Sequence, residues 1–497
     1  MRQNSRDLFA SLGSDGLVNE TVRGSAIVIG TQAITFSLTM VTVIVLAHLL
    51  TPSDYGVYGL LLIVMNFLLV FSKAGISEAI LQSATIDHSE ASSLFWFNIV
   101  LATAMAGVCA VISPFAAWFF HVPHLQIALC VIGLTFPISA LGAQHRALLQ
   151  RAQRFGATAF SDITQYTCGL IVAIVFAANG GGYWSLIAQG IFGASVGVMV
   201  LWLAARWVPG RPNMTSKIKE LIQIGFNVTG FQSMNFLGTN VDNILIGRVL
   251  GVFQLGLYTR AYTLLVTPIT EVLTPLSSVF IVALSRIRSA EPQSFRLAFV
   301  SLGTKINLLM IPVMAFLIVN AHDVVRLALG QHWDETATIF SVLGFGGIVE
   351  PTIALIGWAL VAQVRSRDYL MIGIARTSVM VCGFFLGVEF GVVGVAVAYA
   401  VVTCASIVPI SAFFGRTGSV GIREVGTSLL PGGLLAVSVG VVSLVVQLGL
   451  SQSDAILRLL GTLSASGLVA ILLVLLVPLL RSEARGVRAL LGGALLK

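Results

Sequence analysis

The chain has few charged residues and no long polar stretch, which excludes an ordinary soluble protein. Only 10% of its 497 residues are Asp, Glu, Lys or Arg, while 57% are hydrophobic. A soluble domain carries about 25% charged residues, because its surface must be solvated. The composition therefore predicts an integral membrane protein whose main solvent is lipid.

Two chemical signatures are also missing. The five cysteines all lie inside apolar stretches, without the spacing of a disulfide framework or a metal site, so we interpret them as packing residues. No GxxxxGK[ST] motif occurs, which argues against an ATPase within the chain. We therefore expect no cofactor and no bound metal. We also expect no nucleic-acid partner, because the net charge of +7 reflects how the basic residues are distributed between the membrane spans.

Fourteen stretches are long and apolar enough to cross a bilayer as helices, which needs about 20 mostly apolar residues each. They run roughly over 24–49, 58–81, 92–119, 125–148, 157–178, 183–206, 220–248, 256–282, 298–319, 335–362, 369–387, 392–413, 427–448 and 458–480. The connections between them are short, which leaves little room for an extramembrane catalytic site. The sequence thus predicts an all-α fold of 14 transmembrane helices and no enzyme.

The basic residues predict the orientation of these spans. If the N-terminus is cytoplasmic, the cytoplasmic segments hold 21 lysines and arginines, and the opposite side holds four, which are Arg248, Arg260, Arg326 and Arg458. Cytoplasmic loops of membrane proteins carry an excess of Lys and Arg. We therefore expect both the N-terminus and the C-terminus in the cytoplasm.

The sequence repeats itself at a shift of 200 residues. Ten identities fall within the 31 positions of 28–58 when they are aligned without a gap to 228–258. The copies lie in the first and seventh predicted spans, six spans apart, so both run in the same direction across the membrane. This is a parallel repeat, in which two halves can rock about a central cavity.

The repeat predicts the organisation of the chain as two six-helix lobes with two extra helices. The expected parts are a cytoplasmic N-terminal segment over 1–23, an N-lobe over 24–206, a cytoplasmic linker over 207–219, a C-lobe over 220–413, the thirteenth and fourteenth spans over 427–480, and a cytoplasmic amphipathic tail over 481–497. Arginines beside leucines in that tail are typical of a helix lying on the membrane surface.

Polar residues recur at helical spacing inside three predicted spans. They are Thr35 and Thr39 in the first span, Asn235, Thr239 and Asp242 in the seventh, and Arg260, Thr267 and Glu271 in the eighth. Charged side chains are costly in the bilayer, about 2.5–3.5 kcal/mol on insertion scales, so they usually face water or a partner. We expect these stripes to line an aqueous lumen. The alternative for the threonines is that each hydroxyl bonds back to its own helix.

Three further cations lie within predicted spans, and so does the carboxylate of Glu350. The cations are Lys73, Lys305 and Arg376, which could bind a phosphate group or reach the membrane surface. Glu350 precedes Pro351, and proline interrupts the hydrogen bonding of a helix. Glu350 and Pro351 are therefore a candidate hinge or ion site, and a structural ion pair is the alternative.

Several motifs resemble those of polysaccharide exporters in the MOP superfamily, which are Wzx-type flippases. The loop Leu50–Gly59 (LTPSDYGVYG) and its repeat partner Gly256–Tyr262 (GLYTRAY) carry the resemblance. Three more segments are similar to the colanic acid and succinoglycan exporter type, namely Ser93–Asn98 (SLFWFN), Arg146–Gln150 (RALLQ) and Gly330–Trp333 (GQHW). Lys73 stands where that type often has an acid followed by an aromatic residue, so no role for an acid carries over.

The resemblance implies a MATE-like flippase in the bacterial inner membrane. Its substrate would be an undecaprenyl-pyrophosphate-linked oligosaccharide for exopolysaccharide synthesis, moved by alternating access between the lobes, with a polysaccharide polymerase and co-polymerase as neighbours and membrane lipid around it. Arg260, Lys73, Lys305 and Arg376 would supply cations for the pyrophosphate. A cation-coupled multidrug exporter of the same architecture is the alternative, favoured by Asp242, Glu271 and Glu350. A membrane glycan polymerase or ligase is a third interpretation, which the short loops disfavour.

Overall fold

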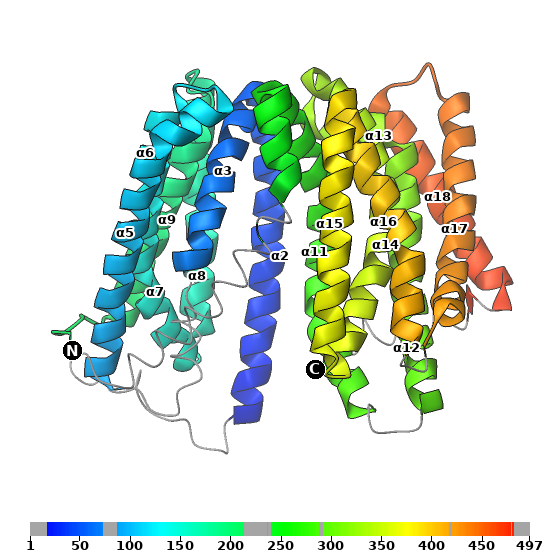
Figure 1. Cartoon of the computed structure of the whole chain (residues 1–497), viewed down its shortest axis with the longest axis horizontal. Coiled ribbons are helices and arrows are strands. Elements are labelled where there is room, and N and C mark those ends of the chain that lie inside the picture. The colour runs from blue at the N-terminus through cyan, green and yellow to red at the C-terminus, as the bar shows by residue number, and fades with distance from the viewer. Residues whose placement is uncertain are drawn as a thin grey trace. The chain divides into compact units, whose positions relative to one another are not determined.

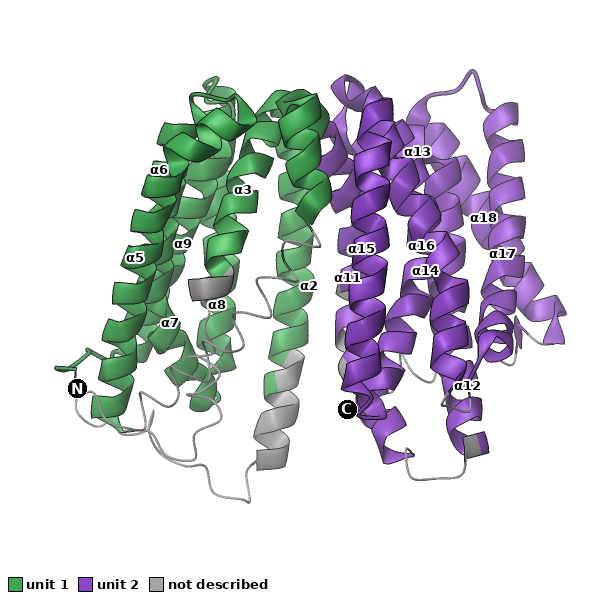
Figure 2. Ribbon diagram, viewed as in Figure 1, with its two compact units in different colours: residues 1–256 green, residues 257–497 purple. Residues whose placement is uncertain are grey.

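The computed structural model describes residues 17–72, 87–212, 236, 240–287, 292–416, 420–478 and 480–481. All regular structure within these ranges is helical. The chain divides into two compact units, Met1–Gly256 and Leu257–Lys497, which are coloured separately in Figure 2. Each unit is described by itself below.

Unit 1 is a bundle of antiparallel helices (Figure 1). Its elements are α2 (Leu17–Leu49), α3 (Pro52–Ser72), α5 (His88–Phe120), α6 (Leu125–Gly133), α7 (Thr135–Arg151), α8 (Phe155–Ala178), α9 (Trp184–Ala205) and η1 (Ile246–Leu250). The most extensive interface joins α8 to α9, and α2 packs along α8. A Cβ at Gly193 would lie 2.9 Å from the backbone oxygen of Gln165, so this interface depends on small residues that let two backbones approach.

Unit 2 holds the rest of the helices. They are α11 (Val252–Arg286), whose first turn lies in unit 1, then α12 (Pro292–Val319), α13 (Ala321–Leu329), η2 (Gln331–Trp333), α14 (Asp334–Ala362), α15 (Ser366–Gly387), η3 (Val388–Phe390), α16 (Gly391–Gly415), α17 (Ile422–Gly449) and α18 (Ala455–Leu476). Here α12 packs on α14 and α17, and α16 packs on α14 and α15.

The prediction of a multi-pass helical membrane protein is confirmed. The described residues contain 11 helical segments long and apolar enough to cross a membrane, and one of them, Ser366–Gly415, includes both α15 and α16. Each predicted span overlaps a described helix, the seventh only near its end, over 240–248. The seventh, 220–248, lies largely outside the described residues, so the count of fourteen stays a prediction.

Local geometry recurs at equivalent positions of the repeat. One helical segment ends at Leu49 and the next begins at Pro52, while η1 ends at Leu250 and α11 begins at Val252. A second pair of connections shares an unusual backbone, because Gln153 has φ of 50° and Val364 has φ of 59°, each two residues before the first residue of the next helix. These connections are similar in the two copies; the two lobes, their boundaries and the terminal segments stay predictions.

The acidic residue of the LTPSDYG motif has a structural role. The Asp54 carboxylate accepts hydrogen bonds from the Thr51 backbone N–H at 3.0 Å and from the Tyr183 backbone N–H at 2.9 Å. The Asp54 N–H donates in turn to the Thr51 hydroxyl, which completes a capping box at the start of α3. Gly182 has φ of +52° and leaves room for the carboxylate. This part of the motif fixes α3 to the loop before α9.

Helix α17 is bound into unit 2 by a buried polar cluster. The Thr352 hydroxyl donates to the Asn307 side-chain oxygen at 2.9 Å, and the Asn307 amide donates to the Ser428 carbonyl at 3.2 Å. A Cβ at Gly432 would lie 2.5 Å from the Asn307 backbone oxygen, so α12 and α17 touch closely. Beyond the ends of α12 and α17, the helices that follow them are also joined: Arg458 of α18 binds Asp323 of α13 with N–O distances of 2.6 and 3.2 Å. The two extra helices are thus integral parts of unit 2.

Candidate functional site

An ion pair joins α14 to α15 within a membrane-spanning region of unit 2. Arg376 donates from its two terminal nitrogens to the two carboxylate oxygens of Glu350, at 2.6 and 3.3 Å. The side chains are 23% and 31% exposed. This two-bond geometry is the strong form of an arginine–carboxylate contact, and it neutralises both charges where an isolated charge would be costly.

The sequence around Glu350 opens space for this pair. Pro351 lies inside α14, which continues to Ala362, and proline cannot donate the hydrogen bond that would close the preceding turn. In that turn, a Cβ at Gly346 would lie 2.6 Å from the ring of Tyr399, so only glycine leaves room for the tyrosine of α16. The Glu350 carboxylate therefore lies in a turn of α14 where Pro351 removes one backbone hydrogen bond and Gly346 leaves room for the Tyr399 ring.

Two tyrosines complete a polar cluster in unit 2. The rings of Tyr262 on α11 and Tyr399 on α16 meet edge to face, with centroids 6.3 Å apart. Both lie close enough to Arg376 to interact with its charge. Four helices, α11, α14, α15 and α16, thus each contribute one polar side chain to the cluster formed by Tyr262, Glu350, Arg376 and Tyr399.

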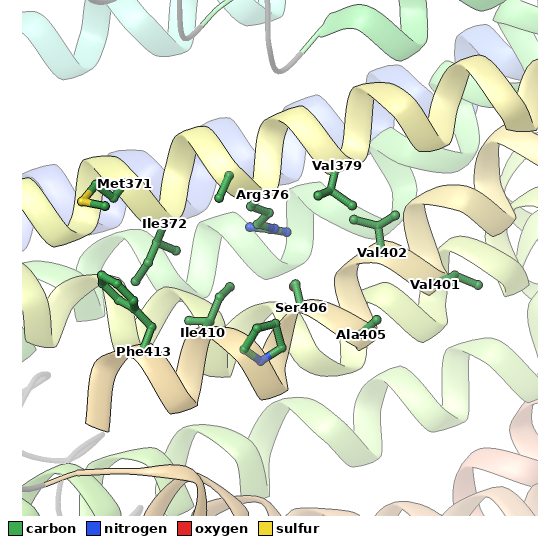
Figure 3. A pocket seen from close by; sticks show the side chains of 12 residues that line it. Met371, Ile372, Arg376, Val379, Val401, Val402, Ala405, Ser406, Ile410 and Phe413 are labelled. Atoms are coloured by element: carbon green, nitrogen blue, oxygen red, sulfur yellow. The ribbon is translucent and has the colours of Figure 1, made fainter. Parts of the chain in front are cut away.

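An apolar groove of about 610 Å³ runs between α15 and α16 beside this cluster (Figure 3). It extends from Met371 and Phe413 at one end to Val379 and Val401 at the other. Figure 3 shows Arg376 pointing between the two helices, and it is the one charged side chain among the described residues that line the groove. The site therefore combines a long apolar wall with a single cation.

Two of the four predicted cations, Arg376 and Lys305, have different partners in the described structure. Arg376 pairs with Glu350, whereas Lys305 on α12 donates to the Ser301 hydroxyl at 2.9 Å. Lys305 lies two positions from Asn307, about 200° round the helix, so it points away from α14 and α17. Arg260 is half-buried on α11, and Lys73 lies outside the described residues. Arg376 is thus placed against Glu350, another predicted site residue.

The threonines of the predicted lumen follow the alternative interpretation in their hydrogen bonding. Thr35 donates to the Thr31 carbonyl at 2.9 Å, and Thr39 donates to the Thr35 carbonyl at 2.8 Å. Each hydroxyl proton is thereby used within α2, which leaves only the oxygen lone pairs for a ligand. Thr267 is half-buried on α11, so its place beside a lumen stays a prediction.

The remaining predicted residues are partly beyond what the structure describes. Asn235 and Thr239 lie outside the described residues, as does the side chain of Glu271. Asp242 is 5% exposed and accepts a hydrogen bond from the Asn243 N–H at 2.8 Å. Among the described residues, no three His, Cys, Asp or Glu side chains are grouped as a metal site would require.

Sequence reasoning missed the two tyrosines of the cluster. Tyr262 ends the GLYTRAY segment, so its place in a motif was a usable signal. Tyr399 stands alone in an apolar run, and only the packing of α16 on Gly346 of α14 reveals its role.

Comparisons with known proteins agree with the motifs. A family model described as a polysaccharide biosynthesis protein matches residues 45–338, which is more than half of the chain. The chain is 22% identical over 393 residues to the lipopolysaccharide biosynthesis protein WzxC of Escherichia coli (strain K12), covering 78% of this chain and 79% of that protein. It is 25% identical over 354 residues to the succinoglycan biosynthesis transport protein ExoT of Rhizobium meliloti (strain 1021), covering 68% and 71%.

Solved structures share the fold. The lipid II flippase MurJ, in an inward closed conformation, matches with a TM-score of 0.66 and 13% identity over 91% of this chain and 97% of that one. An inward-facing multidrug resistance transporter of the MATE family matches with a TM-score of 0.59 and 15% identity, covering 78% and 96%. At these identities the likeness concerns the fold alone, and it extends over most of both chains.

Proposed function

This chain belongs to the polysaccharide biosynthesis protein family and is a polysaccharide exporter of the MOP superfamily, and from that premise we propose that it flips an undecaprenyl-pyrophosphate-linked oligosaccharide repeat unit across the bacterial inner membrane. The observation that carries the proposal is the family match over residues 45–338, together with relatives named for polysaccharide biosynthesis and transport. In this role the chain is a carrier and not an enzyme.

The proposed mechanism is alternating access between two lobes. A parallel repeat supplies two similar halves that can rock against each other. The substrate needs a route for hydrated sugars, a cation for its phosphates and contact with lipid for its tail. Arg376, beside an apolar groove in unit 2, offers the last two of these features together. A polymerase and a co-polymerase would act on the unit after it has crossed.

A deletion strain tests this function. Without the gene, lipid-linked repeat units are expected to accumulate in the cytoplasmic leaflet, and surface polysaccharide is expected to be lost. Restoring the chain from a plasmid should return both to normal. A strain that keeps its full surface polysaccharide after deletion, with no second exporter in the genome, would exclude the proposal.

Drug sensitivity distinguishes the proposed flippase from a multidrug exporter of the same fold. Such a pump relies on membrane carboxylates to attract organic cations. Glu350 is bonded to Arg376, so this carboxylate is not free to bind a cation in the described conformation. Expression of the chain in a pump-deficient strain should therefore leave the inhibitory concentrations of cationic drugs unchanged.

The proposed topology places both ends of the chain in the cytoplasm. The motivating observation is the excess of basic residues, 21 to four, in alternate connections. Reporter fusions after Lys497 should report the cytoplasm, and fusions after Trp118 should report the periplasm. Finding both reporters on one side would show that a span has been missed or added.

A further inference from the structure

We propose that the groove between α15 and α16 binds the apolar chain of the lipid-linked substrate, with the phosphate nearest to that chain bound by Arg376. This inference rests on the proposed function and adds the place where the lipid part is held. The groove lies wholly within unit 2, and its walls come from two consecutive helices (Figure 3).

The shape and chemistry of the groove fit a single hydrocarbon chain. Met371 and Val379 are eight positions apart on α15, which corresponds to about 12 Å of wall at 1.5 Å per residue. Apart from Arg376, the lining offers one polar side chain, Ser406, and its hydroxyl already donates to the Thr403 carbonyl at 2.8 Å. Apart from Arg376, sugar hydroxyls would find no free hydrogen-bond donor among these side chains, whereas a chain of methyl and methylene groups would bury against Val, Ile and Phe side chains.

Arg376 supplies the charge that selects a phosphate. Its two terminal nitrogens bond to Glu350, but its Nε is buried and has no hydrogen-bond partner. A buried donor without a partner is costly, and a phosphate oxygen at Nε would satisfy it. Because the guanidinium fork matches two oxygens at once, a phosphate can take Nε–H and displace one carboxylate oxygen for the neighbouring N–H.

The same lining disfavours an ordinary phospholipid. A glycerol backbone places two ester groups between its phosphate and its chains, and these groups require hydrogen-bond donors or water. Apart from Arg376, the groove is lined by apolar side chains and by Ser406, whose hydroxyl already donates to the Thr403 carbonyl. A prenyl phosphate, in which the chain is joined directly to the phosphate, avoids that cost.

Binding by the purified full-length chain tests the proposal with four probes. Geranylgeranyl diphosphate carries a chain and a phosphate, geranylgeraniol carries the chain alone, inorganic pyrophosphate carries the phosphate alone, and phosphatidylglycerol carries both through glycerol. We expect geranylgeranyl diphosphate to bind at least about tenfold more tightly than each of the other three, a difference of about 1.4 kcal/mol.

Three variants locate the binding. Ala405→Trp fills the groove and should weaken geranylgeranyl diphosphate binding by about tenfold or more, whereas Val408→Trp, an exposed position on α16 that does not line the groove, should bind normally. The double variant Arg376→Gln/Glu350→Gln removes the cation without leaving a lone charge, and its affinity should fall to that of geranylgeraniol.

Specific outcomes overturn the proposal. Unchanged binding by Ala405→Trp would show that the chain sits elsewhere, and equal affinity for geranylgeraniol would remove Arg376 from recognition. Equal affinity for phosphatidylglycerol would make the groove a site for ordinary membrane lipid. If groove variants export repeat units normally, the groove proposal fails while the proposed function stands; if the unaltered chain exports none, the function itself fails.

Discussion

Replacing Gly56 or Gly256 by alanine is expected to destabilise the protein and abolish export. A Cβ at Gly56 would lie 1.7 Å from the backbone oxygen of Val252, and a Cβ at Gly256 would lie 1.8 Å from the backbone oxygen of Pro52. Both contacts lie within unit 1, where the first turn of α3 touches the first turn of α11. Neither partner is a side chain that could rotate away, so the two helix starts would have to move apart.

The contact is reciprocal because the four residues are two positions of the 200-residue repeat. Gly56 corresponds to Gly256, and Pro52 corresponds to Val252. Small residues allow helices in membranes to approach closely enough for backbone contact. Overpacking a tight interface costs about 1–3 kcal/mol and sometimes more. Since both alanines disrupt one interface, the double variant should be little worse than either single variant.

The measurement is the melting temperature of the purified protein together with surface polysaccharide in the deletion strain. Gly190→Ala is the matched control, because that glycine lies within α9 and a Cβ there would meet nothing within 4 Å. A Gly56→Ala protein that melts and exports like the unaltered chain would show that the close contact is needed for neither stability nor export.

Arg376→Gln is expected to abolish export, and Glu350→Gln is expected to reduce it less. The first variant leaves a carboxylate without its partner in a membrane span. Breaking a buried pair in this way costs about 3–5 kcal/mol. Because the Arg376 and Glu350 side chains are 23% and 31% exposed, we expect a smaller loss of stability, about 1–3 kcal/mol.

The double variant separates structure from transport. Arg376→Gln/Glu350→Gln has no lone charge, so its stability should return close to that of the unaltered chain while export stays lost. Exchanging the two residues keeps the pair but moves the cation from α15 to α14, away from the groove, and should also fail to export. Full export by the double variant would reduce the pair to a structural contact.

A second ion pair in unit 2 provides the control. Arg458 and Asp323 join α18 to α13 and do not line the groove. Neutralising both, as Arg458→Gln/Asp323→Asn, removes a pair of similar geometry at another place. We expect this double variant to export normally, which would assign the effect of Arg376 to its position beside the groove.

Much of the fold could be predicted because membrane helices are specified locally. A run of about 20 apolar residues is sufficient for a span, and each predicted span overlaps a described helix, the seventh only over 240–248. The repeat was visible from its identities at a shift of 200 residues. Gly56 and Gly256, each of which lies against the backbone of another helix, are one of these identities. Their contact itself could not be predicted, since it depends on how α3 meets α11.

The candidate site was harder to predict, because it depends on which helix faces meet. Arg376 and Glu350 are 26 residues apart on two helices, and periodicity within one helix does not pair them. Polar spacing also does not distinguish a lumen from internal hydrogen bonding, as the hydroxyls of Thr35 and Thr39 show. Lys305 was grouped with Arg376 by charge and depth, yet it lies on the face of α12 opposite Asn307.

The most direct test of the central claim is transport of a lipid-linked sugar by the purified chain in liposomes. The substrate is the prenyl-diphosphate-linked repeat unit isolated from the deletion strain, and a glycosidase that cannot enter the liposomes reports the fraction in the outer leaflet. With the substrate initially confined to the inner leaflet, we expect the accessible fraction to rise with time in liposomes that contain the chain, and to stay low with Arg376→Gln/Glu350→Gln. An accessible fraction that stays the same with and without the unaltered chain would contradict the account.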